Sequence, residues 1–547
     1  MTSEEKFVIL ASSLGTIFEW YDFYLYAVLA PFFAALFFPS GNDTAALLSA
    51  FATYAAGFLV RPFGALVFGR IGDLVGRKYT FLITIMVMGS STFLVGLLPT
   101  FTAIGWLAPI LLVTLRLCQG LALGGEYGGA ATYVAEHARP GERGYATSWI
   151  QTTATLGLLL ALIVIALCRE YMPLKDFADW GWRIPFVVSV ILLLFSVYIR
   201  LKLNESPIFQ KMKDEGKGSR APLTESFFHS PNNKYVLLAL LGATAGQGVV
   251  WYTGQFYALF FLTITLKLAY IPAYTLIGLS LVIGTPFFVF FGWLSDRIGR
   301  LKIILAGCLI AALTYFPLFA ALTHYVNPDL EAFAQKNPIT LTADSSTCQV
   351  HIFVTAFTKF STCDKAKDFV TKLGLSFTTV DAPGSGDKVS LQIGSTKLDG
   401  FSPDAWNAAF LAAGYPNLTK DVTGKIVPKS ADQFKVDWAM AELILVIMVI
   451  YVTMVYGPIA AFLVELFPTK IRYTSMSLPY HIGNGWFGGM LPLLATAFVA
   501  AYGDIYFGLW YPVGVAVMTF IIGLLFLRDT KDVDIVTSSG VQLQSRA

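Results

Sequence analysis

Apolar stretches of about 20 residues recur along the whole chain and constrain its fold more than any other feature. A helix of about 20 apolar residues crosses ~30 Å of hydrocarbon, whereas a membrane β-barrel shows alternating segments of about 10 residues. The chain of 547 residues is 56% hydrophobic and 13% charged, and soluble domains carry about 25% charged residues. We therefore expect an all-α polytopic membrane protein.

Twelve such stretches predict twelve transmembrane helices, at 8–38, 45–69, 79–99, 103–136, 145–169, 183–203, 235–263, 270–292, 302–325, 436–467, 473–502 and 505–527. Basic residues gather in the even-numbered connections, such as Lys78 after the second span and Arg297 after the eighth. We expect a protein of the plasma (inner) membrane, and the positive-inside rule then places both of its termini in the cytoplasm. Because residues 1–10 lack a basic segment with a small-residue cleavage site, we expect no cleavable signal. A net charge of +3 is too small to indicate a nucleic-acid partner.

An internal repeat divides the chain. The motif GRIGDLVGRKYT at 69–80 returns as GWLSDRIGRLKI at 292–303, which is 223 residues later, whereas EHARPGER at 136–143 returns as ELFPTKIR at 465–472, which is 329 residues later. The difference of 106 residues indicates an insertion. We predict an N-terminal half at 1–203 and a cytoplasmic loop at 204–234. A C-terminal half follows at 235–325 and 436–530, interrupted by an inserted domain at 326–435, and a cytoplasmic tail occupies 531–547.

The predicted insert follows the ninth span, so we expect it to face outward. Short β-rich segments separated by turn signals such as PGSG predict a small β or α+β domain. Cys348 and Cys363 lie within it. A disulfide between them is expected in an oxidising exterior, and two free thiols are the alternative.

The motif Gly-x-x-x-Asp-x-x-Gly-Arg after the second and eighth spans resembles that of the major facilitator superfamily. The runs EWYDFYLY, AAGFLVRPFGALVFGRIGDLVGRK, RLCQGLALGGEYGGAATYVAEHARPGERG and WGWRIPF together resemble its metabolite:proton symporter family, which includes permeases for α-ketoglutarate, shikimate, citrate and proline/betaine. The resemblance covers 1–325 and 436–530 but not the insert. It implies two pseudo-symmetric six-helix halves that move a small molecule across the bilayer. We expect a monomer that needs no cofactor and uses the proton as its coupling ion.

Two carboxylates lie in the first apolar span. Glu19 and Asp22 share a helix face with Tyr26, and the fourth span adds Glu126. Ionisable groups inside a span are functional candidates, and burial favours the protonated form of a carboxyl. We predict that these three acids couple transport to protons. The alternative is a salt bridge to a neighbouring helix.

Arg61 in the second span and Arg116 in the fourth offer planar forks for a carboxylate. We predict that at least one binds an anionic substrate, and an internal ion pair is the alternative. Other polar and aromatic residues of the spans are expected to line the same cavity, although each can equally be a core residue: Tyr26, Gln119, Tyr127, Gln247, Trp251, Gln255, Tyr480 and Asn484.

The repeated motifs are predicted to form a gate latch, with simple topogenic charge as the alternative. An aspartate there can bond a helix N-terminus or an arginine in one conformation and release it in the other, and glycine permits the tight turn. The gating residues are Asp73, Gly76, Arg77, Glu136, Arg143, Asp296, Gly299, Arg300, Glu465 and Arg472, with Arg183 at the outer end of the sixth span.

These features predict a secondary active transporter rather than an enzyme. It would take up a small organic acid such as α-ketoglutarate together with protons, by alternating access. One alternative is a proton-coupled transporter of compatible solutes such as proline or betaine. Another is a transporter-like receptor that senses a ligand through the insert.

Overall fold

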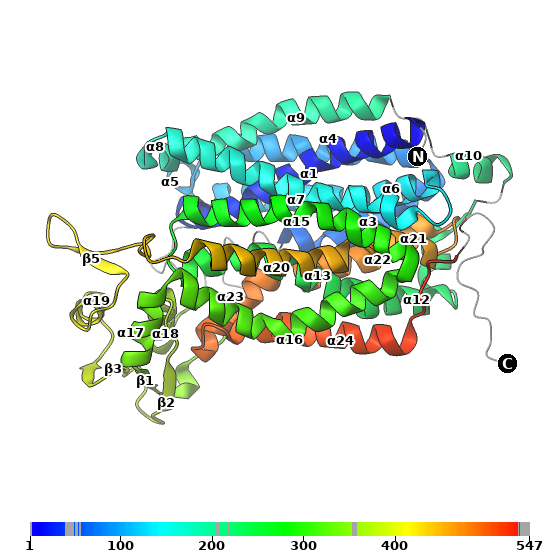
Figure 1. Cartoon of the computed structure of the whole chain (residues 1–547). Helices are drawn as coiled ribbons and strands as arrows, with labels where there is room; N and C mark the ends of the chain where they lie inside the picture. The colour runs from blue at the N-terminus through cyan, green and yellow to red at the C-terminus, as the bar shows by residue number, and fades with distance from the viewer. Residues whose placement is uncertain are drawn as a thin grey trace.

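The structure is a computed structural model that describes residues 3–38, 49, 53, 56–202, 205, 207–216, 218–352, 358–533 and 535. Long helices run side by side along one axis, and a small mixed domain lies at one end of them (Figure 1). The start of the first helix and the end of the last lie at the opposite end. We call these the insert end and the motif end, because the repeated motifs lie at the second.

Six long helices form the N-terminal half. Helix α7 packs against α1 within this half and against α15 of the other half, and α3 packs against α22 of the other half. The bounds are α1 (Ser3–Phe37), α3 (Arg61–Leu74), α4 (Arg77–Leu97), α6 (Leu107–His137), α7 (Arg143–Tyr171) and α9 (Ile184–Leu201), with the short α5 (Phe101–Ile104) and α8 (Leu174–Asp179) between them.

The C-terminal half repeats this arrangement with more broken helices. Two short helices, α10 (Pro207–Asp214) and α11 (Pro222–Phe227), precede it. Its elements are α12 (Asn232–Ala239), α13 (Ala245–Tyr252), α14 (Ala258–Phe260), α15 (Tyr270–Ile298), α16 (Arg300–Val326), α20 (Trp438–Tyr456), α21 (Ile459–Leu466), α22 (Arg472–His481), α23 (Leu491–Tyr502) and α24 (Trp510–Phe526). Within the described residues, ten helical stretches are long and apolar enough to cross a membrane. With α1 and α3 in the first two positions, the predicted two six-helix halves are confirmed.

The predicted seventh, tenth and eleventh spans are interrupted in their interiors. Pro458 separates α20 from α21 in the tenth span, because proline lacks the N–H that a helix interior needs. The seventh span contains three π-helical segments and the eleventh contains one. These two spans contact each other closely, and Thr244 Oγ1 donates to the Pro479 carbonyl oxygen at 2.8 Å. Such wide turns are frequent at functional sites.

The insert is an α+β domain, as predicted. Four strands form a sheet in the order β2-β1-β3-β4, in which β1 and β2 are parallel and the other pairs antiparallel. Leu341 lies opposite Leu391 in this sheet, and both are buried. The elements are α17 (Pro328–Lys336), β1 (Ile339–Ala343), α18 (Thr362–Lys372), β2 (Thr378–Asp381), β3 (Ser390–Ile393), β4 (Thr396–Asp399), α19 (Pro403–Ala412) and the hairpin β5 (Leu418–Lys420) with β6 (Ile426–Pro428).

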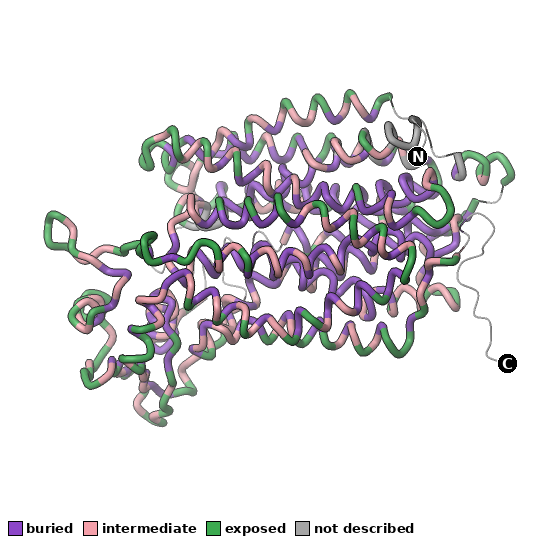
Figure 2. Tube along the Cα trace, in the orientation of Figure 1, coloured by how far each residue is buried: buried purple, intermediate pink, exposed green. Residues whose placement is uncertain are grey.

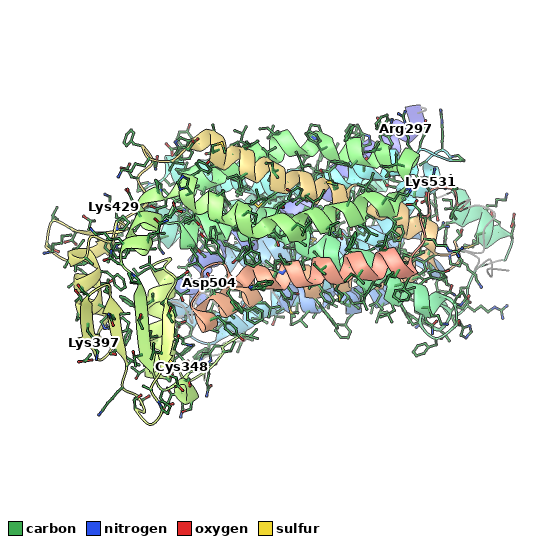
Figure 3. All side chains as sticks on the ribbon, turned by 60° about the horizontal axis from the view of Figure 1, so that its bottom comes forward. Arg297, Cys348, Lys397, Lys429, Asp504 and Lys531 are labelled. Carbon is green, nitrogen blue, oxygen red and sulfur yellow. A yellow bond between two sulfur atoms is a disulfide. The ribbon has the colours of Figure 1, made fainter. Side chains whose placement is uncertain are left out.

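The insert is fastened both internally and to the bundle. Cys348 and Cys363 form a disulfide with their Cα atoms 5.3 Å apart (Figure 3). Lys367 Nζ donates to the Ala501 carbonyl oxygen at 2.9 Å, and the Phe377 N–H donates to the Gly503 carbonyl oxygen at 2.7 Å. Helix α18 and the loop after it therefore hold the domain against the end of α23.

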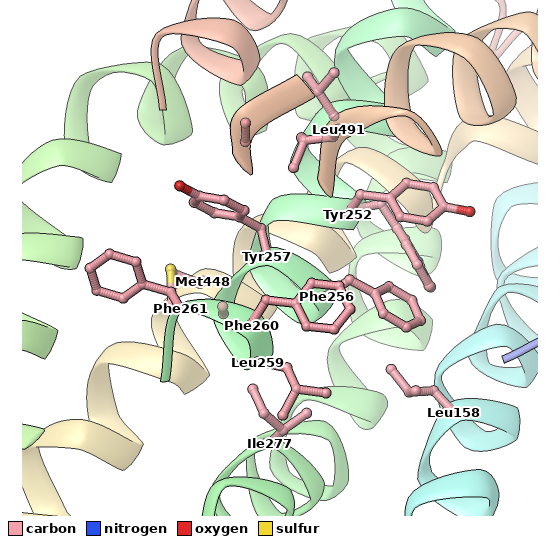
Figure 4. Close-up of a cluster of buried hydrophobic side chains, with 14 of the residues drawn as sticks. Leu158, Tyr252, Phe256, Tyr257, Leu259, Phe260, Phe261, Ile277, Met448 and Leu491 are labelled. Carbon is pink, nitrogen blue, oxygen red and sulfur yellow. The ribbon is translucent and has the colours of Figure 1, made fainter. Parts of the chain in front are cut away.

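Burial is greatest along the interface of the two halves (Figure 2). In contrast, the outer face of α9 exposes Ile191 and Leu194, which is expected of a helix that faces lipid. The seventh span packs at the centre: Phe256 and Phe260 lie among side chains of both halves, with Leu158 on one side and Ile277 on another (Figure 4).

Candidate substrate and proton site

Arg61 begins α3 and is fully buried between the halves. Its guanidinium carbon lies 4.2 Å from the Phe23 ring centroid and 4.0 Å from that of Phe58. None of its three guanidinium nitrogens has a hydrogen-bond partner among the described residues. The Arg61 guanidinium therefore contacts aromatic faces, and its N–H groups are available to bind a further ligand.

Arg116 on α6 approaches the same ring, with its guanidinium carbon 4.5 Å from the Phe23 centroid and 4.5 Å from that of Tyr26. Its Nη1 donates to Gln119 Oε1 at 2.7 Å, and Gln119 Nε2 donates to Thr92 Oγ1 at 2.7 Å. The structure thus brings together Arg61, Arg116 and Tyr26, whereas Gln119 orients Arg116.

The two acids of α1 have different surroundings. Glu19 forms an ion pair with Arg200 of α9, and Arg200 Nη1 also donates to Glu126 Oε2 at 3.1 Å. Thr84 Oγ1 donates to the same Glu126 oxygen at 3.1 Å. Asp22 is equally buried, and the described residues supply no hydrogen bond to its Oδ1 and no ion pair. The predicted acid cluster therefore splits into an ion-paired triad and a separate aspartate.

Arg200 was absent from the predicted site. It lies near the end of an apolar span in the run YIRLK, where an arginine ordinarily marks the membrane interface. The structure instead buries it. The available signal for a buried arginine was the presence of Glu19 and Glu126 in other spans, because charged groups inside a membrane span pair with one another.

The C-terminal half supplies aromatic and amide groups. Trp251 Nε1 and both polar atoms of the Gln255 side chain are buried without a hydrogen-bond partner among the described residues. Gln247 and Asn484 instead satisfy each other through two reciprocal hydrogen bonds of 3.0 and 2.8 Å. The Trp251 indole and the Gln255 amide can therefore bind a ligand.

Aromatic stacking joins the two halves at this level. The Tyr127 and Tyr480 rings are parallel, with centroids 3.5 Å apart. Gln151 Nε2 donates to the Tyr127 hydroxyl at 2.6 Å, and Tyr456 and Tyr480 share a hydrogen bond of 2.8 Å. Toward the insert end, the Tyr24 and Trp251 rings stack at 5.6 Å.

The repeated aspartates lie at helix N-termini of the opposite half. Asp73 accepts hydrogen bonds from the backbone N–H and the hydroxyl of Thr474, at 3.0 and 2.7 Å. Asp296 accepts from the backbone N–H groups of Gly144 and Tyr145, at 2.9 and 2.8 Å. The partial positive charge of a helix N-terminus favours these carboxylates.

Two cross-half ion pairs flank them. Arg472 lies 3.3 Å from Glu136, and Arg143 lies 3.7 Å from Glu465. Arg300 also pairs with Glu465 at 3.0 Å. These five side chains are buried.

The remaining predicted gating residues have local roles in the structure. Gly76 and Gly299 have φ values of 148° and 117° at the sharp turns of the repeated motifs. Arg183 Nη1 donates to the carbonyl oxygens of Gly96 and Leu98 at the end of α4. The side chain of Arg77 lies outside the described part of the chain.

Residues 7–226 match the family model described as "Sugar (and other) transporter", and residues 130–361 match "MFS/sugar transport protein". The shikimate transporter of Escherichia coli K12 is 36% identical over 326 residues, which is 58% of this chain and 73% of that protein. The chain belongs to the major facilitator superfamily. The α-ketoglutarate permease of the same organism is 35% identical, over 60% of this major facilitator chain and 74% of the permease. These relatives are transporters rather than enzymes, in agreement with the prediction.

A putative metabolite transport protein of Haemophilus influenzae is 30% identical over 535 residues, which cover 96% of this chain and 95% of that protein. Most of the insert therefore lies within the alignment to this putative transport protein. Among solved structures, the proton:xylose symporter XylE bound to 6-bromo-6-deoxy-D-glucose has a TM-score of 0.65 at 16% identity, over 97% of this chain and 98% of XylE. This likeness shows the fold alone.

Proposed function

We propose that this transporter takes up a small organic acid together with protons. The observation that carries the proposal is Arg61, a fully buried guanidinium whose nitrogens have no hydrogen-bond partner among the described residues. An uncompensated cation in a low-dielectric interior is costly, and a substrate carboxylate offsets that cost with a bidentate contact. Arg116, Trp251 and Gln255 are proposed to complete the substrate site.

Asp22 is proposed as the proton-coupling group. Burying an ionised carboxylate without a counter-charge costs roughly several kcal/mol of free energy, so Asp22 holds a proton when the site is closed to water. Glu19 and Glu126 instead both pair with Arg200. We assign these two acids the role of fixing α9 against α1 and α6.

The two halves are proposed to rock about this site. Contacts between them exist at the motif end, through Asp73 and Thr474, and toward the insert end, through Tyr24 and Trp251. A site closed at both ends corresponds to an occluded intermediate of alternating access. We further propose that both termini lie in the cytoplasm, that the insert faces outward and that the protein works as a monomer.

The test is uptake of labelled α-ketoglutarate into proteoliposomes with an imposed proton gradient. Arg61→Lys keeps the charge but removes the planar fork, so we expect a rise in KM of about tenfold or more. Arg70→Lys on the exposed face of the same helix is the matched control and leaves uptake unchanged. Unchanged substrate affinity in both Arg61→Lys and Arg116→Lys overturns the assignment of the carboxylate site.

A transporter of zwitterionic compatible solutes is the second candidate. The ring centroids of Tyr24, Trp251 and Phe256 lie 5.1 to 5.8 Å from one another, with Phe256 tilted to the other two rings, and aromatic faces attract quaternary ammonium groups. Uptake of labelled betaine and of labelled α-ketoglutarate, measured side by side, separates the candidates. Uptake of betaine without uptake of α-ketoglutarate favours the second.

A further inference from the structure

A cavity of about 530 Å³ lies between the insert and the end of the seventh span. Its size falls in the range of small-molecule sites. Helix α18, the start of α19 and the β5–β6 hairpin form its walls, and the loop after the seventh span closes it on the bundle side. The cavity belongs to a part of the chain that the proposed transport site does not use.

Three lysines line this cavity: Lys267, Lys365 and Lys372. Residues 365, 368, 369 and 372 fall on one face of α18, because positions three, four and seven residues apart share a helical face. Lys267 reaches the cavity from the bundle. Its Nζ donates to the Ile264 carbonyl oxygen at 2.7 Å and also to the Lys372 carbonyl oxygen.

The lining carries more positive than negative charge. Asp368 is the one acid among the residues that line the cavity, against three ammonium groups. Burial, together with the nearby Lys372 charge, lowers the pKa of Lys267 to about 8. Lys365 Nζ has no hydrogen bond or ion pair within the described residues. An anion in the cavity relieves the repulsion between these like charges.

The other walls suit a carbon skeleton. Phe369 and Phe401 pack edge to face at 6.0 Å, and Tyr415 lies on the same cavity, where its hydroxyl donates to the Leu373 carbonyl oxygen. Aromatic walls with a few charged groups are the usual composition of sites for small organic ligands. Inorganic ions need no such walls.

We propose that this cavity is a second binding site, in the insert, for a small organic anion that carries carboxylate groups. Lys365 and Lys372 bind the carboxylates, and Phe369 and Phe401 contact the carbon skeleton. Lys267 connects the site to the seventh span, which carries Trp251 and Gln255 of the proposed transport site. The choice of carboxylates rests on the proposed function, whereas the positive lining does not.

The test uses isothermal titration calorimetry on the full chain in lipid nanodiscs. An Arg61→Gln background removes the proposed transport site, so that remaining binding reports the insert. Succinate is the probe, and succinamide is the neutral ligand of similar size. We expect succinate to bind, with affinity about tenfold weaker or more in Lys365→Met and in Lys372→Met.

Lys397→Met is the matched control variant. Lys397 is an exposed lysine of β4, away from the cavity lining (Figure 3), so its loss leaves succinate affinity unchanged. Equal binding of succinate and succinamide, or full succinate affinity in the Lys365→Met/Lys372→Met double variant, overturns the proposal. If succinate binds at the insert but α-ketoglutarate is not taken up, the proposed transport function is wrong and the insert site stands. If α-ketoglutarate is taken up but succinate does not bind at the insert, the insert site is wrong and the transport function stands.

The pH dependence gives a readout that does not require a lysine variant to fold. The groups around Lys267 are Lys365, Asp368, Lys372 and Tyr415, and burial raises the pKa of Tyr415, which keeps it neutral. Protonated Lys267 favours an anion, so succinate affinity falls as the pH rises through about 8. Affinity that is constant between about pH 7 and pH 9 contradicts this coupling.

Discussion

Asp73 of the N-terminal half accepts two hydrogen bonds from Thr474 of the C-terminal half, one from the backbone N–H and one from the hydroxyl. Asp296 forms the equivalent contact in the opposite direction, with Gly144 and Tyr145 at the start of α7. Each half therefore binds a helix N-terminus of the other. The repeat of the motif thus produces a pair of reciprocal contacts that must both release when this end opens.

Asp73→Asn is expected to favour opening of the motif end. The amide retains an acceptor for Thr474 but loses the charge that the helix N-terminus stabilises, a loss of about 1 kcal/mol or roughly a fivefold shift in population. Spin labels at exposed Tyr79 and Lys302 report this opening as a larger fraction of long distances in pulsed electron resonance. Asp532→Asn, at a highly exposed aspartate of the same end, is the control. Identical distance distributions for Asp73→Asn and the unmodified chain would rule out the latch.

The sequence alone predicted the helical bundle and the place of the insert, because hydrophobic length and the repeat offset are properties of the linear chain. It also placed Asp73 and Asp296 at corresponding positions. It did not show whether the pairs Glu136–Arg143 and Glu465–Arg472 lie within a half or across the halves. The structure pairs Glu136 with Arg472 and Arg143 with Glu465, and such exchange of partners depends on how the halves pack.

The cross-half pair of Glu136 and Arg472 is expected to couple the two halves energetically. Removing one partner takes away a buried counter-charge and costs about 3–5 kcal/mol of stability. The double variant Glu136→Gln/Arg472→Gln removes both charges, so it costs less than the sum of the single variants. Titration with sodium dodecyl sulfate measures the free energy of unfolding of all four proteins in the cycle. Additive losses would show that the two side chains act independently.

Asp22→Asn and Glu19→Gln are expected to have different consequences. Asp22→Asn removes the proposed proton carrier, so substrate addition to proteoliposomes no longer drives proton influx, whereas exchange of internal for external substrate continues. Glu19→Gln leaves Arg200 paired with Glu126, so coupling persists while the stability of the bundle falls. A pH-sensitive dye inside the vesicles measures proton influx. Full coupling in the Asp22→Asn/Glu19→Gln double variant would exclude both acids.

The difference between these two acids was not accessible from the sequence. Glu19 and Asp22 are three residues apart on one face, and both lie in an apolar run. Their roles separate only because α9 places Arg200 beside Glu19. Residues on one helix have predictable relative positions, but the choice of partner on another helix depends on helix rotation and packing.

Loss of the disulfide is expected to loosen the insert without unfolding the bundle. Cys348 and Cys363 are 15 residues apart, and a crosslink that closes a loop of about 15 residues contributes about 3 kcal/mol. In Cys348→Ser, amide hydrogen exchange in β1 and α18 becomes faster, whereas exchange in α15 does not change. Cys118→Ser, at a free thiol of the bundle, leaves the exchange of the insert unchanged. Unaltered protection in α18 of Cys348→Ser would contradict a structural role for the disulfide.

Acid is expected to destabilise the insert through Asp344. Hydrogen bonds from the Ser346 hydroxyl and N–H, at 2.6 and 3.0 Å, and from the Gly384 N–H, at 2.9 Å, lower the pKa of this carboxyl. Because the pKa is lower in the folded state, the contribution to stability is present above the ordinary value of about 3.9 and disappears as the pH falls through the folded pKa. Hydrogen exchange of the insert between about pH 3 and pH 6, corrected for intrinsic rates, therefore shows a loss of protection at the acid end that is smaller in Asp344→Asn. Asp399→Asn, at an exposed aspartate of β4, keeps the full acid response, and an equal response in Asp344→Asn would contradict the assignment.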